Sequence, residues 1–448
     1  MDINPAIFKA YDIRGVCPKD LNEDVAYRIG RAFVSYLNVD QVVVGLDMRI
    51  SSPMLHASLI HGITEQGADV VDIDMVSSDM FYYACGSTGL SGITVTASHN
   101  PPEYNGFKMV KRMPELLSGG KGMEELRDLV FKGCYEDTGK KGSVCKVNIK
   151  EGYRQKILSL VNVNKIKPMK VVVDASNGMG GVAFDLTYRD IPLEVVKMHF
   201  DPDGTFPNHD GDPLLEENRQ ELQERVVSES ADLGFAFDPD ADRFFAIDSQ
   251  GVFIPGDFMT ALLGRYLVEK HGGGTVVYDT RASWAVRDLI EAAGGGTVEM
   301  RVGHAFIKPK MQEVNAVFGG EVTGHYYFPD FFYADSGVIP SLILLEMLSI
   351  YGKSLTNLVE PLKQKYFLSG EINSLVNNPD NILAMIRDAY NGKHKINELD
   401  GISIVDKGWH ANIRKSNTEP LVRLNVEGLS HTIMEQKRDE LLKIIRAN

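Results

Sequence analysis

Three stretches of the sequence repeat one pattern, in which a β-branched run ends in aspartate and leads through small or polar residues into a helical stretch. They are VVVGLDMRISS (42–52), VVVDASNGMGG (171–181) and TVVYDTRASWA (275–285), with Asp47, Asp174 and Asp279 at the strand ends. Each is followed by a second strand, within 68–74, 193–198 and 297–302, and by a third strand that ends in a polar loop, within 92–101, 231–243 and 315–325. Strand–loop–helix units in this order are typical of parallel α/β sheets, so the repeats predict three related α/β domains.

The last part of the chain has a different pattern. A helical stretch at 381–391 leads into the strands of GISIVDK and WHANIRKSNTEPLVRLNVEG, and an amphipathic helix ends the sequence. We therefore predict an α/β chain of three related α/β domains of similar topology (1–148, 149–250 and 251–364) plus a smaller C-terminal α+β domain (365–448) around a central cleft. Ligands of open α/β sheets bind at the carboxyl ends of strands, which directs attention to the loops there.

Composition excludes several classes of protein. The 448 residues carry a net charge of −14 and no dense basic block, so nucleic acid is not expected as a partner. Four scattered cysteines without a C-x-x-C favour a reduced, cytoplasmic setting. The amino-terminal residues do not look like a secretory signal, and the longest apolar run (337–350) contains Pro340 and Glu346. We interpret that run as a buried helix and expect no membrane partner.

The third strand of the second repeat ends in DPDADR, which places Asp238, Asp240 and Asp242 at alternate positions. In an extended segment these side chains share one face, where three carboxylates repel one another unless a cation lies among them. Oxygen ligands without His or Cys favour Mg²⁺ or Ca²⁺. The EF-hand pattern fails, because Arg243 and Ser249 stand where it needs Gly and Glu. The alternative is a solvated acidic turn.

The third strand of the first repeat ends in TASHNP, with Ser98 among small residues. Thr96 and Asn100 stand where the G-x-S-x-G elbow of a hydrolase has glycine, so a Ser–His–Asp hydrolase is poorly supported. Three carboxylates leave Mg²⁺ short of ligands, and a phosphate on Ser98 would supply another oxygen. A serine that carries phosphate beside a metal is the interpretation we favour over a plain turn. His99 and Lys108 are nearby candidates for proton or charge assistance.

Two further loops carry donors and acceptors suited to a sugar phosphate. GGEVTGH offers Glu321, Thr323 and His325 for sugar hydroxyls, with His304 in the same predicted domain. RKSNTEPLVR offers a turn that can hold a phosphate, where guanidinium, hydroxyl and amide donors gather. Ordinary turns are the alternative for both. Single candidates elsewhere are Arg14 in AYDIRG and Arg281 in DTRAS.

Five motifs in order, YDIRG, TASHNP, DPDADR, GEVTGH and RKSNTEP, give the chain a resemblance to the α-D-phosphohexomutase family, in its phosphomannomutase/phosphoglucomutase branch. The resemblance spans nearly the whole chain. It implies four domains around a deep cleft and an enzyme that moves a phosphoryl group on a hexose phosphate. Thr323 departs from the family's usual serine but keeps a hydroxyl.

The resemblance also implies a role for each candidate residue. Ser98 matches the phosphorylated serine, which with Asp238, Asp240 and Asp242 would bind Mg²⁺. Arg243 matches the residue that holds the phosphoserine region, and His325 a histidine of acid–base role. Glu321 and Thr323 match the residues that bind the 3- and 4-hydroxyls of the sugar. The remaining matches are cleft residues near the transfer site (Arg14, His99, Lys108 and His304) and the site of the phosphate that does not react (Arg414, Ser416, Asn417 and Thr418). Arg281 and Arg423 are added as substrate-binding candidates.

The reaction implied is the interconversion of mannose 6-phosphate and mannose 1-phosphate, with use of glucose phosphates as well. It would proceed through hexose 1,6-bisphosphate, which is both intermediate and activator. A phosphoglucomutase or phosphoglucosamine mutase of the same family is the close alternative, and a metal-dependent sugar-phosphate phosphatase a more distant one. We expect small-molecule hexose phosphates as partners and a monomer or homodimer.

Overall fold

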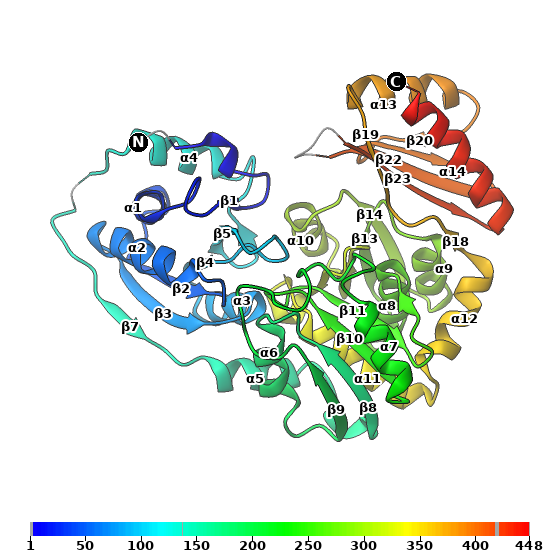
Figure 1. The fold of residues 1–448 in the computed structure, drawn as a ribbon, viewed down its shortest axis with the longest axis horizontal. Helices are drawn as coiled ribbons and strands as arrows, with labels where there is room; N and C mark the ends of the chain where they lie inside the picture. Colours follow the sequence, from blue (N-terminus) through cyan, green and yellow to red (C-terminus); the bar gives the residue numbers. More distant parts are fainter. Residues whose placement is uncertain (1–2, 137, 417–420, 448) are drawn as a thin grey trace. The chain divides into compact units, whose positions relative to one another are not determined.

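The computed structural model describes residues 3–136, 138–416 and 421–447 (Figure 1). The chain divides into two compact units. Unit 1 comprises Met1–Phe253 and Thr323–Ser354, and unit 2 comprises Ile254–Val322 and Leu355–Asn448. Asn417 and Thr418, which the sequence assigns to phosphate binding, lie outside the described residues.

The first sheet of unit 1 has the strand order β1-β5-β4-β2-β3-β7, with β6 paired to β5. Helices α1, α2 and α4 share one buried core with the apolar side chains of β2, β4 and β5. Helix α3 packs against β2, β4 and β5 as well. The elements are η1 (Pro5–Ile7), β1 (Ile13–Val16), α1 (Glu23–Leu37), β2 (Gln41–Leu46), α2 (Ser52–Glu65), β3 (Asp69–Met75), α3 (Ser78–Thr88), β4 (Ser91–Val95), β5 (Tyr104–Arg112), β6 (Glu115–Leu116), α4 (Met123–Lys132) and β7 (Val144–Lys146).

The second sheet of unit 1 contains β11-β10-β8-β9 in that order. Strand β10 is buried along its whole length, because its residues LGFAF are small or apolar at every position. The elements are α5 (Lys150–Leu158), η2 (Val163–Lys165), β8 (Met169–Asp174), α6 (Gly180–Tyr188), β9 (Leu193–Met198), α7 (Gln220–Ser228), β10 (Leu233–Phe237), β11 (Phe244–Asp248) and β12 (Phe253–Ile254).

The third repeat provides elements to both units. In unit 2, β13 lies between β14 and β15, and the elements are α8 (Gly256–His271), β13 (Thr275–Asp279), α9 (Trp284–Ala292), β14 (Gly296–Met300), α10 (His304–Glu313) and β15 (Phe318–Gly320). In unit 1, β16 pairs with β17 in antiparallel fashion, and the elements are β16 (Tyr326–Phe328), η3 (Pro329–Phe331), β17 (Ala334–Asp335) and α11 (Val338–Tyr351).

The predicted threefold repeat is confirmed strand by strand. In each repeat the first strand lies between the second and the third and is parallel to both: β2 between β3 and β4, β8 between β9 and β10, and β13 between β14 and β15. The turn after the first strand is also shared. The carboxylates of Asp47, Asp174 and Asp279 each accept a hydrogen bond from the backbone N–H two residues further on.

The C-terminal part of unit 2 is the predicted α+β fold. Its strands have the order β18-β23-β22-β21-β20, with β19 also paired to β23, and α13 and α14 share an apolar core with them. Figure 1 shows this sheet with both helices beside it. The elements are α12 (Leu355–Lys365), β18 (Phe367–Leu368), β19 (Ile372–Leu375), α13 (Pro379–Tyr390), β20 (Lys395–Asn397), β21 (Ile402–Val405), β22 (Trp409–Lys415), β23 (Leu421–Gly428) and α14 (His431–Arg446).

The long apolar run forms α11, and nearly all of this helix is buried. Among the described residues no single helix is long and apolar enough to cross a membrane, and only α11 and α12 taken as a bent pair meet that test. Burial of α11 accounts for its composition, because a helix that is apolar on every side belongs in a core.

Candidate active site

Ser98 lies in the loop between β4 and β5, and only 2% of its surface is exposed. Its backbone is left-handed, with φ of +49°, and its N–H donates to Thr96 Oγ1 at 3.0 Å. The hydroxyl donates to Asp238 Oδ2 at 2.8 Å. A non-glycine residue held in this conformation is uncommon outside constrained turns. The loop therefore fixes the Ser98 hydroxyl toward the acidic turn of the second repeat.

The Arg49 side chain fixes this loop by hydrogen bonds to its backbone carbonyls. Its guanidinium donates to the carbonyl oxygens of Ser98 at 2.6 Å and of Pro101 at 2.8 Å, and also to those of Asn100 and Tyr104. The side chain has no exposed surface and lies 3.4 Å from the Asp47 carboxylate. A planar group with five donors suits four carbonyls that converge on one point. Arg49 thus fixes the backbone around Ser98 and is a positioning residue.

The three aspartates lie in a turn between β10 and β11. The sequence-based expectation of an extended segment with alternating side chains is wrong, because Ala241 has a left-handed backbone with φ of +60°. The Asp238 carboxylate accepts the Arg243 backbone N–H at 3.1 Å, which closes the turn. Ligand oxygens of all three aspartates nevertheless lie within 4.8 Å of one another. The turn, rather than strand alternation, brings these carboxylates together.

Lys108, on β5, bridges two of these carboxylates. Its ammonium contacts Asp240 Oδ2 at 2.6 Å and the Asp242 carboxylate. Burial opposes the charged ammonium, but Asp240 and Asp242 outweigh it and raise the pKa of Lys108 well above its ordinary value. Burial also raises the pKa of Asp238, and Asp242 and Asp240 add to the rise. Lys108 therefore compensates only part of the negative charge.

The carboxylate oxygens fit a divalent cation. All three aspartates are buried, and among the described residues no hydrogen-bond donor reaches Asp240 Oδ1. A buried carboxylate oxygen without a partner is costly, and a hard cation satisfies it. With the Ser98 hydroxyl at 2.8 Å from Asp238, this oxygen set suits Mg²⁺.

His99 and Arg243 form a second contact beside Ser98. His99 Nδ1 accepts a hydrogen bond from Arg243 Nη2 at 2.9 Å and lies 3.2 Å from Ser98 Oγ. Burial lowers the pKa of His99 well below its ordinary value, and the charges of Arg243 and Arg14 lower it further. These influences favour the neutral imidazole at His99. On its other side, Arg243 Nη1 lies 3.6 Å from Asp212 Oδ1.

The other predicted residues of unit 1 also lie at this site. Arg14, on β1, donates to the Ala97 carbonyl at 2.7 Å and contacts the Asn100 side chain. His325 Nε2 lies 3.5 Å from Asp242 Oδ1. His325 Nδ1 in turn lies 3.1 Å from Thr323 Oγ1. Unit 1 thus brings together Ser98 and its predicted neighbours.

In unit 2, three arginines surround Glu371. Arg423 Nη1 lies 2.8 Å from Glu371 Oε1, while Arg281 Nη1 and Arg414 Nη2 lie 3.4 and 3.7 Å from Oε2. Burial would raise the pKa of Glu371, but the three guanidinium groups lower it below its ordinary value. Arg281 is also paired with Asp279 at 2.9 Å. Two carboxylates, Glu371 and Asp279, face three arginines, which leaves cationic donors for a further anion.

We call Arg281, Arg414 and Arg423 the arginine cluster. Three more predicted residues belong to unit 2, and one of them, Glu321, lies beside this cluster. Glu321 Oε2 accepts the Gly303 N–H at 2.8 Å and lies 4.0 Å from Arg281 Nη2. His304 directly follows Gly303 and begins α10. Ser416 follows β22, and its N–H donates to the Leu421 carbonyl at 2.9 Å.

Arg49, Asp212 and Glu371 were not predicted from the sequence. For Arg49 a signal exists, because LDMRISS and YDTRASW share the order Asp-x-Arg-x-Ser and Arg281 of the second stretch was singled out. For Asp212 and Glu371 the sequence offers no local signal, since each acts only through residues distant along the chain.

A buried serine and three clustered carboxylates at the carboxyl ends of strands, with a lysine from the middle of β5, are typical of a phosphoryl-transferring enzyme on a repeated α/β fold. Comparison with known proteins agrees. Domains I, II, III and IV of the phosphoglucomutase/phosphomannomutase profiles match residues 5–129, 151–251, 255–366 and 371–444. The chain belongs to the phosphoglucomutase/phosphomannomutase family of α-D-phosphohexomutases.

Curated relatives span the whole chain. A protein named phosphomannomutase from Salmonella montevideo is 39% identical and covers 99% of this chain and 100% of its own length. A phosphomannomutase from Escherichia coli K12 is 38% identical over 98% of both chains. A protein from Xanthomonas campestris strain B100 named phosphohexose mutases is 41% identical over 98% of this chain and 99% of its own.

Solved structures show the same fold. A phosphoglucomutase/phosphomannomutase family protein from Burkholderia thailandensis superposes with a TM-score of 0.91 at 32% identity, covering 100% of this chain and 98% of that one. A putative phosphomannomutase from Thermus thermophilus gives a TM-score of 0.83 at 21% identity, covering 99% and 100%. The predicted α/β fold class, with three similar domains and a different C-terminal domain, is confirmed.

Proposed function

We propose that the protein interconverts mannose 6-phosphate and mannose 1-phosphate and that Ser98 carries the phosphoryl group. The observation that carries the proposal is the Ser98 hydroxyl, 2.8 Å from Asp238 in a turn of three buried carboxylates. The names of several curated relatives, phosphomannomutases at 37–39% identity, support mannose as the sugar, and the relative named phosphohexose mutases at 41% identity is compatible with use of other hexose phosphates.

In the proposed reaction the phosphoryl group on Ser98 Oγ passes to the free hydroxyl of the hexose phosphate. The P–O bond to Ser98 breaks, a P–O bond to the sugar forms, and the sugar hydroxyl loses its proton. The resulting hexose 1,6-bisphosphate turns end for end, and its other phosphate returns to Ser98 to give the isomer. Lys108 and Arg243 would balance phosphoryl charge at this end of the site. Mg²⁺ held by Asp238, Asp240 and Asp242 would neutralise charge that develops on the phosphoryl oxygens.

The remaining candidates would bind the substrate. In this proposal Glu321 and Thr323 contact sugar hydroxyls, and the arginine cluster holds the phosphate that is not reacting, together with Ser416, Asn417 and Thr418. Support comes from the geometry of Arg414 and Arg423, whose guanidinium groups share Glu371 and whose Nε–H groups have no hydrogen-bond acceptor among the described residues. Each phosphate would occupy this cluster in turn, which is what a symmetric exchange requires.

Glucose and glucosamine phosphates are the alternatives within the family, because they differ from mannose phosphate at C2 and the proposed contacts fall on other hydroxyls. A phosphatase would use the same phosphoserine but release inorganic phosphate. We further propose cytoplasmic action as a monomer or homodimer, with hexose phosphates as small-molecule partners.

The first experiment compares turnover of mannose 1-phosphate, glucose 1-phosphate and glucosamine 1-phosphate, with Mg²⁺ and a trace of hexose 1,6-bisphosphate. Inorganic phosphate is assayed in parallel. We expect fast isomerisation of mannose 1-phosphate, slower or equal use of glucose 1-phosphate, and no phosphate release. Faster use of glucosamine phosphate would overturn the sugar assignment, and phosphate release without isomerisation would make the protein a phosphatase.

A second experiment tests the nucleophile. Ser98→Ala removes the oxygen that carries the phosphoryl group, so turnover should fall by at least a thousandfold and the phosphorylated form should disappear from the intact mass spectrum. Ser228→Ala, at an exposed position at the end of α7, is the control. Near-normal turnover of Ser98→Ala would remove Ser98 from the mechanism.

A further inference from the structure

The second repeat differs from the other two at the aspartate that ends its first strand. Asp47 and Asp279 are each compensated by an arginine two residues further on, Arg49 at 3.4 Å and Arg281 at 2.9 Å. In the second repeat Ser176 occupies that position and donates only its backbone N–H. Asp174 is equally buried, at 2% exposure, so its charge requires another cationic partner.

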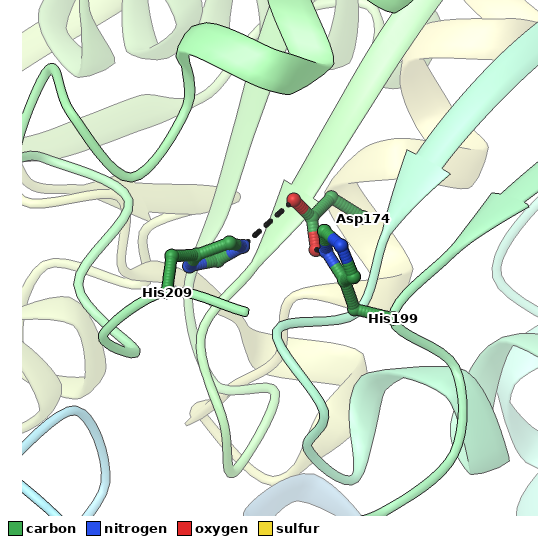
Figure 2. A group of neighbouring side chains, drawn as sticks. All are labelled: Asp174, His199 and His209. Carbon is green, nitrogen blue, oxygen red and sulfur yellow. Dashed lines mark hydrogen bonds and ion pairs between the residues drawn. The ribbon is translucent and has the colours of Figure 1, made fainter. Parts of the chain in front are cut away.

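Two histidines from the segment after β9 face Asp174 instead. His199 Nδ1 lies 3.1 Å from Asp174 Oδ1, and His209 Nε2 lies 3.0 Å from Asp174 Oδ2. Figure 2 shows the carboxylate between the two imidazole rings, with the ring nitrogens directed toward it. Both rings are largely buried, at 11% and 13% exposure of the side chains.

The far nitrogens of both rings already face acceptors. His209 Nδ1 donates to the Asp210 carbonyl at 2.8 Å, and His199 Nε2 lies 3.6 Å from the Glu221 carboxylate. A neutral imidazole has one N–H, so a neutral His209 that bonds Asp210 directs a lone pair at Asp174. Two acceptors cannot face each other at 3.0 Å without a cation, which is either a second proton on the ring or a metal ion.

We propose that Asp174, His199 and His209 bind one divalent transition-metal ion of the zinc type, at a site separate from the acidic turn. One carboxylate oxygen and two imidazole nitrogens are ligands that such ions prefer over Mg²⁺. The candidate ligand atoms lie within 4.8 Å of one another. The two histidine–carboxylate separations, 3.1 Å to Oδ1 and 3.0 Å to Oδ2 of Asp174, are similar to the roughly 3.3 Å that separates ligands about 2.0–2.1 Å from a tetrahedral zinc.

The groups behind the ligands support this assignment. Histidine ligands usually donate the other ring N–H to a carbonyl or carboxylate, which fixes the tautomer that coordinates. The Asp210 carbonyl is such a partner for His209, whereas the Glu221 carboxylate, 3.6 Å from His199 Nε2, lies just beyond hydrogen-bond distance. Water would complete the coordination, because the protein offers three ligands.

The site would anchor residues 199–212, a segment that contacts Arg243 through Asp212. His199 and His209 tie residues 199–209 to the end of β8, and Gly211 and Asp212 follow directly. The position of Gly211 is packed against Pro239 so closely that an added Cβ would meet the proline ring at 2.2 Å. Asp212 lies 3.6 Å from Arg243. The proposed ion is therefore structural, and it rests on residues that the proposed phosphoryl transfer does not use.

The test uses the full chain. Metal is removed with a chelator, and excess Mg²⁺ is then added so that sites made of oxygen ligands are occupied before zinc is supplied. Zinc is then added and the bound amount is measured by equilibrium dialysis and atomic spectroscopy. We expect one zinc per chain, and at least tenfold weaker zinc binding in His199→Gln and His209→Gln. His61→Gln, at an exposed position on α2 where the ring pairs with Glu65, is the control that should bind as the wild type does.

Asp240→Asn distinguishes this site from the acidic turn. Zinc binding that survives Asp240→Asn and is lost in the histidine variants supports the proposal. Zinc binding that is absent from the wild type, equal in the histidine variants, or lost only in Asp240→Asn overturns it. X-ray absorption of the zinc-loaded wild type tests the site even if the variants do not fold. We expect two imidazole ligands on the zinc, and a shell of oxygen atoms alone would contradict the site.

Discussion

Arg49 determines the geometry of Ser98 without reaching the reacting atoms. Arg49→Lys replaces a planar group of five donors by an ammonium of three, so at least one of the four carbonyls in the loop loses its partner. A displacement of about 1 Å at a reacting group can reduce the rate about a hundredfold. We expect kcat to fall by about 10–100-fold with little change in KM, as measured by steady-state kinetics.

The matched control for Arg49→Lys is Arg127→Lys on α4, where the guanidinium pairs with the exposed carboxylate of the adjacent Asp128. Equal kcat values for Arg49→Lys and wild type would show that the loop keeps its shape without the guanidinium. A change in KM alone would place Arg49 in substrate binding rather than in positioning.

For single residues, the sequence indicated a candidate site but not most of the residues that hold this site in place. Ser98, Lys108 and the three aspartates carry reactive or charged groups in distinctive loops, so their types and order indicated a site. Arg49 could have been found by comparing the repeats, since it occupies the position of Arg281. Glu371 could not, because its significance arises only when β19 brings it beside arginines from β22 and β23.

Among the elements, the loop after β8 packs closely against the acidic turn after β10, where Gly178 of the loop meets the backbone of Pro239. A Cβ at Gly178 would lie 2.4 Å from both Cα and the carbonyl oxygen of Pro239, and these backbone atoms cannot yield as a side chain can. Gly178→Ala should therefore displace the turn and destabilise the fold by about 1–3 kcal/mol. We expect weaker Mg²⁺ activation together with a lower melting temperature.

For Gly178→Ala the control is Gly296→Ala on β14, where the nearest atom to an added Cβ is Thr275 Oγ1 at 3.4 Å. Mg²⁺ titrations of activity and thermal unfolding should separate the two variants. If Gly178→Ala retains normal Mg²⁺ dependence, the acidic turn does not depend on this packing.

The hairpin of β22 and β23 presents two arginines of the arginine cluster. Removing Arg414 should weaken binding of a phosphate by one charged contact, about 1.5–3 kcal/mol. We expect Arg414→Ala to raise KM for both mannose 1-phosphate and mannose 6-phosphate by roughly 10–100-fold. Arg387→Ala on α13, whose partner Glu398 is at the surface, is the control. An unchanged KM for either substrate would mean that the non-reacting phosphate binds elsewhere.

At the element scale the repeats were predictable because β-branched runs that end in aspartate recur with the same neighbours. The shape of the acidic turn was not. Alternating aspartates indicate a shared face only in an extended chain, and Ala241 adopts a left-handed backbone instead. That conformation is imposed by contacts distant in sequence, such as the Gly337 N–H bond to the Ala241 carbonyl at 3.0 Å.

Across the whole molecule, fold class followed from sequence, whereas the division into compact units did not. The third repeat provides β13, β14 and β15 to unit 2 and its following residues, Thr323–Ser354, to unit 1. Local sequence patterns identify strands and helices. They do not indicate which hydrophobic core an element joins, because that depends on buried contacts between residues distant in sequence. The proposed boundaries at 250 and 364 therefore describe sequence repeats, which need not coincide with compact units.

Stability of the whole chain should depend on the protonation of Asp257, at the start of α8 in unit 2. Burial raises the pKa of its carboxyl to about 7 from 3.8, and the negative charge of Glu427 adds to the rise. Because the folded state binds this proton more strongly than the unfolded state, the contribution of Asp257 to stability falls as pH rises from about 4 to about 7. Above that range the cost of the buried charge is fully present.

Asp257→Asn removes this charge but keeps one acceptor oxygen, so only one of the backbone N–H groups of Phe258 and Ser283, which bond separate carboxylate oxygens, keeps its partner. Relative to the wild type, the variant should gain stability between pH 4 and pH 8, by roughly 1.4 kcal/mol for each unit of pKa difference. Melting temperatures measured across this range test the expectation, with Asp388→Asn, at an exposed position on α13, as the control. A difference between Asp257→Asn and wild type that is constant from pH 4 to pH 8 would show that Asp257 is ionised in the folded protein throughout, with its charge compensated by the N-terminus of α8.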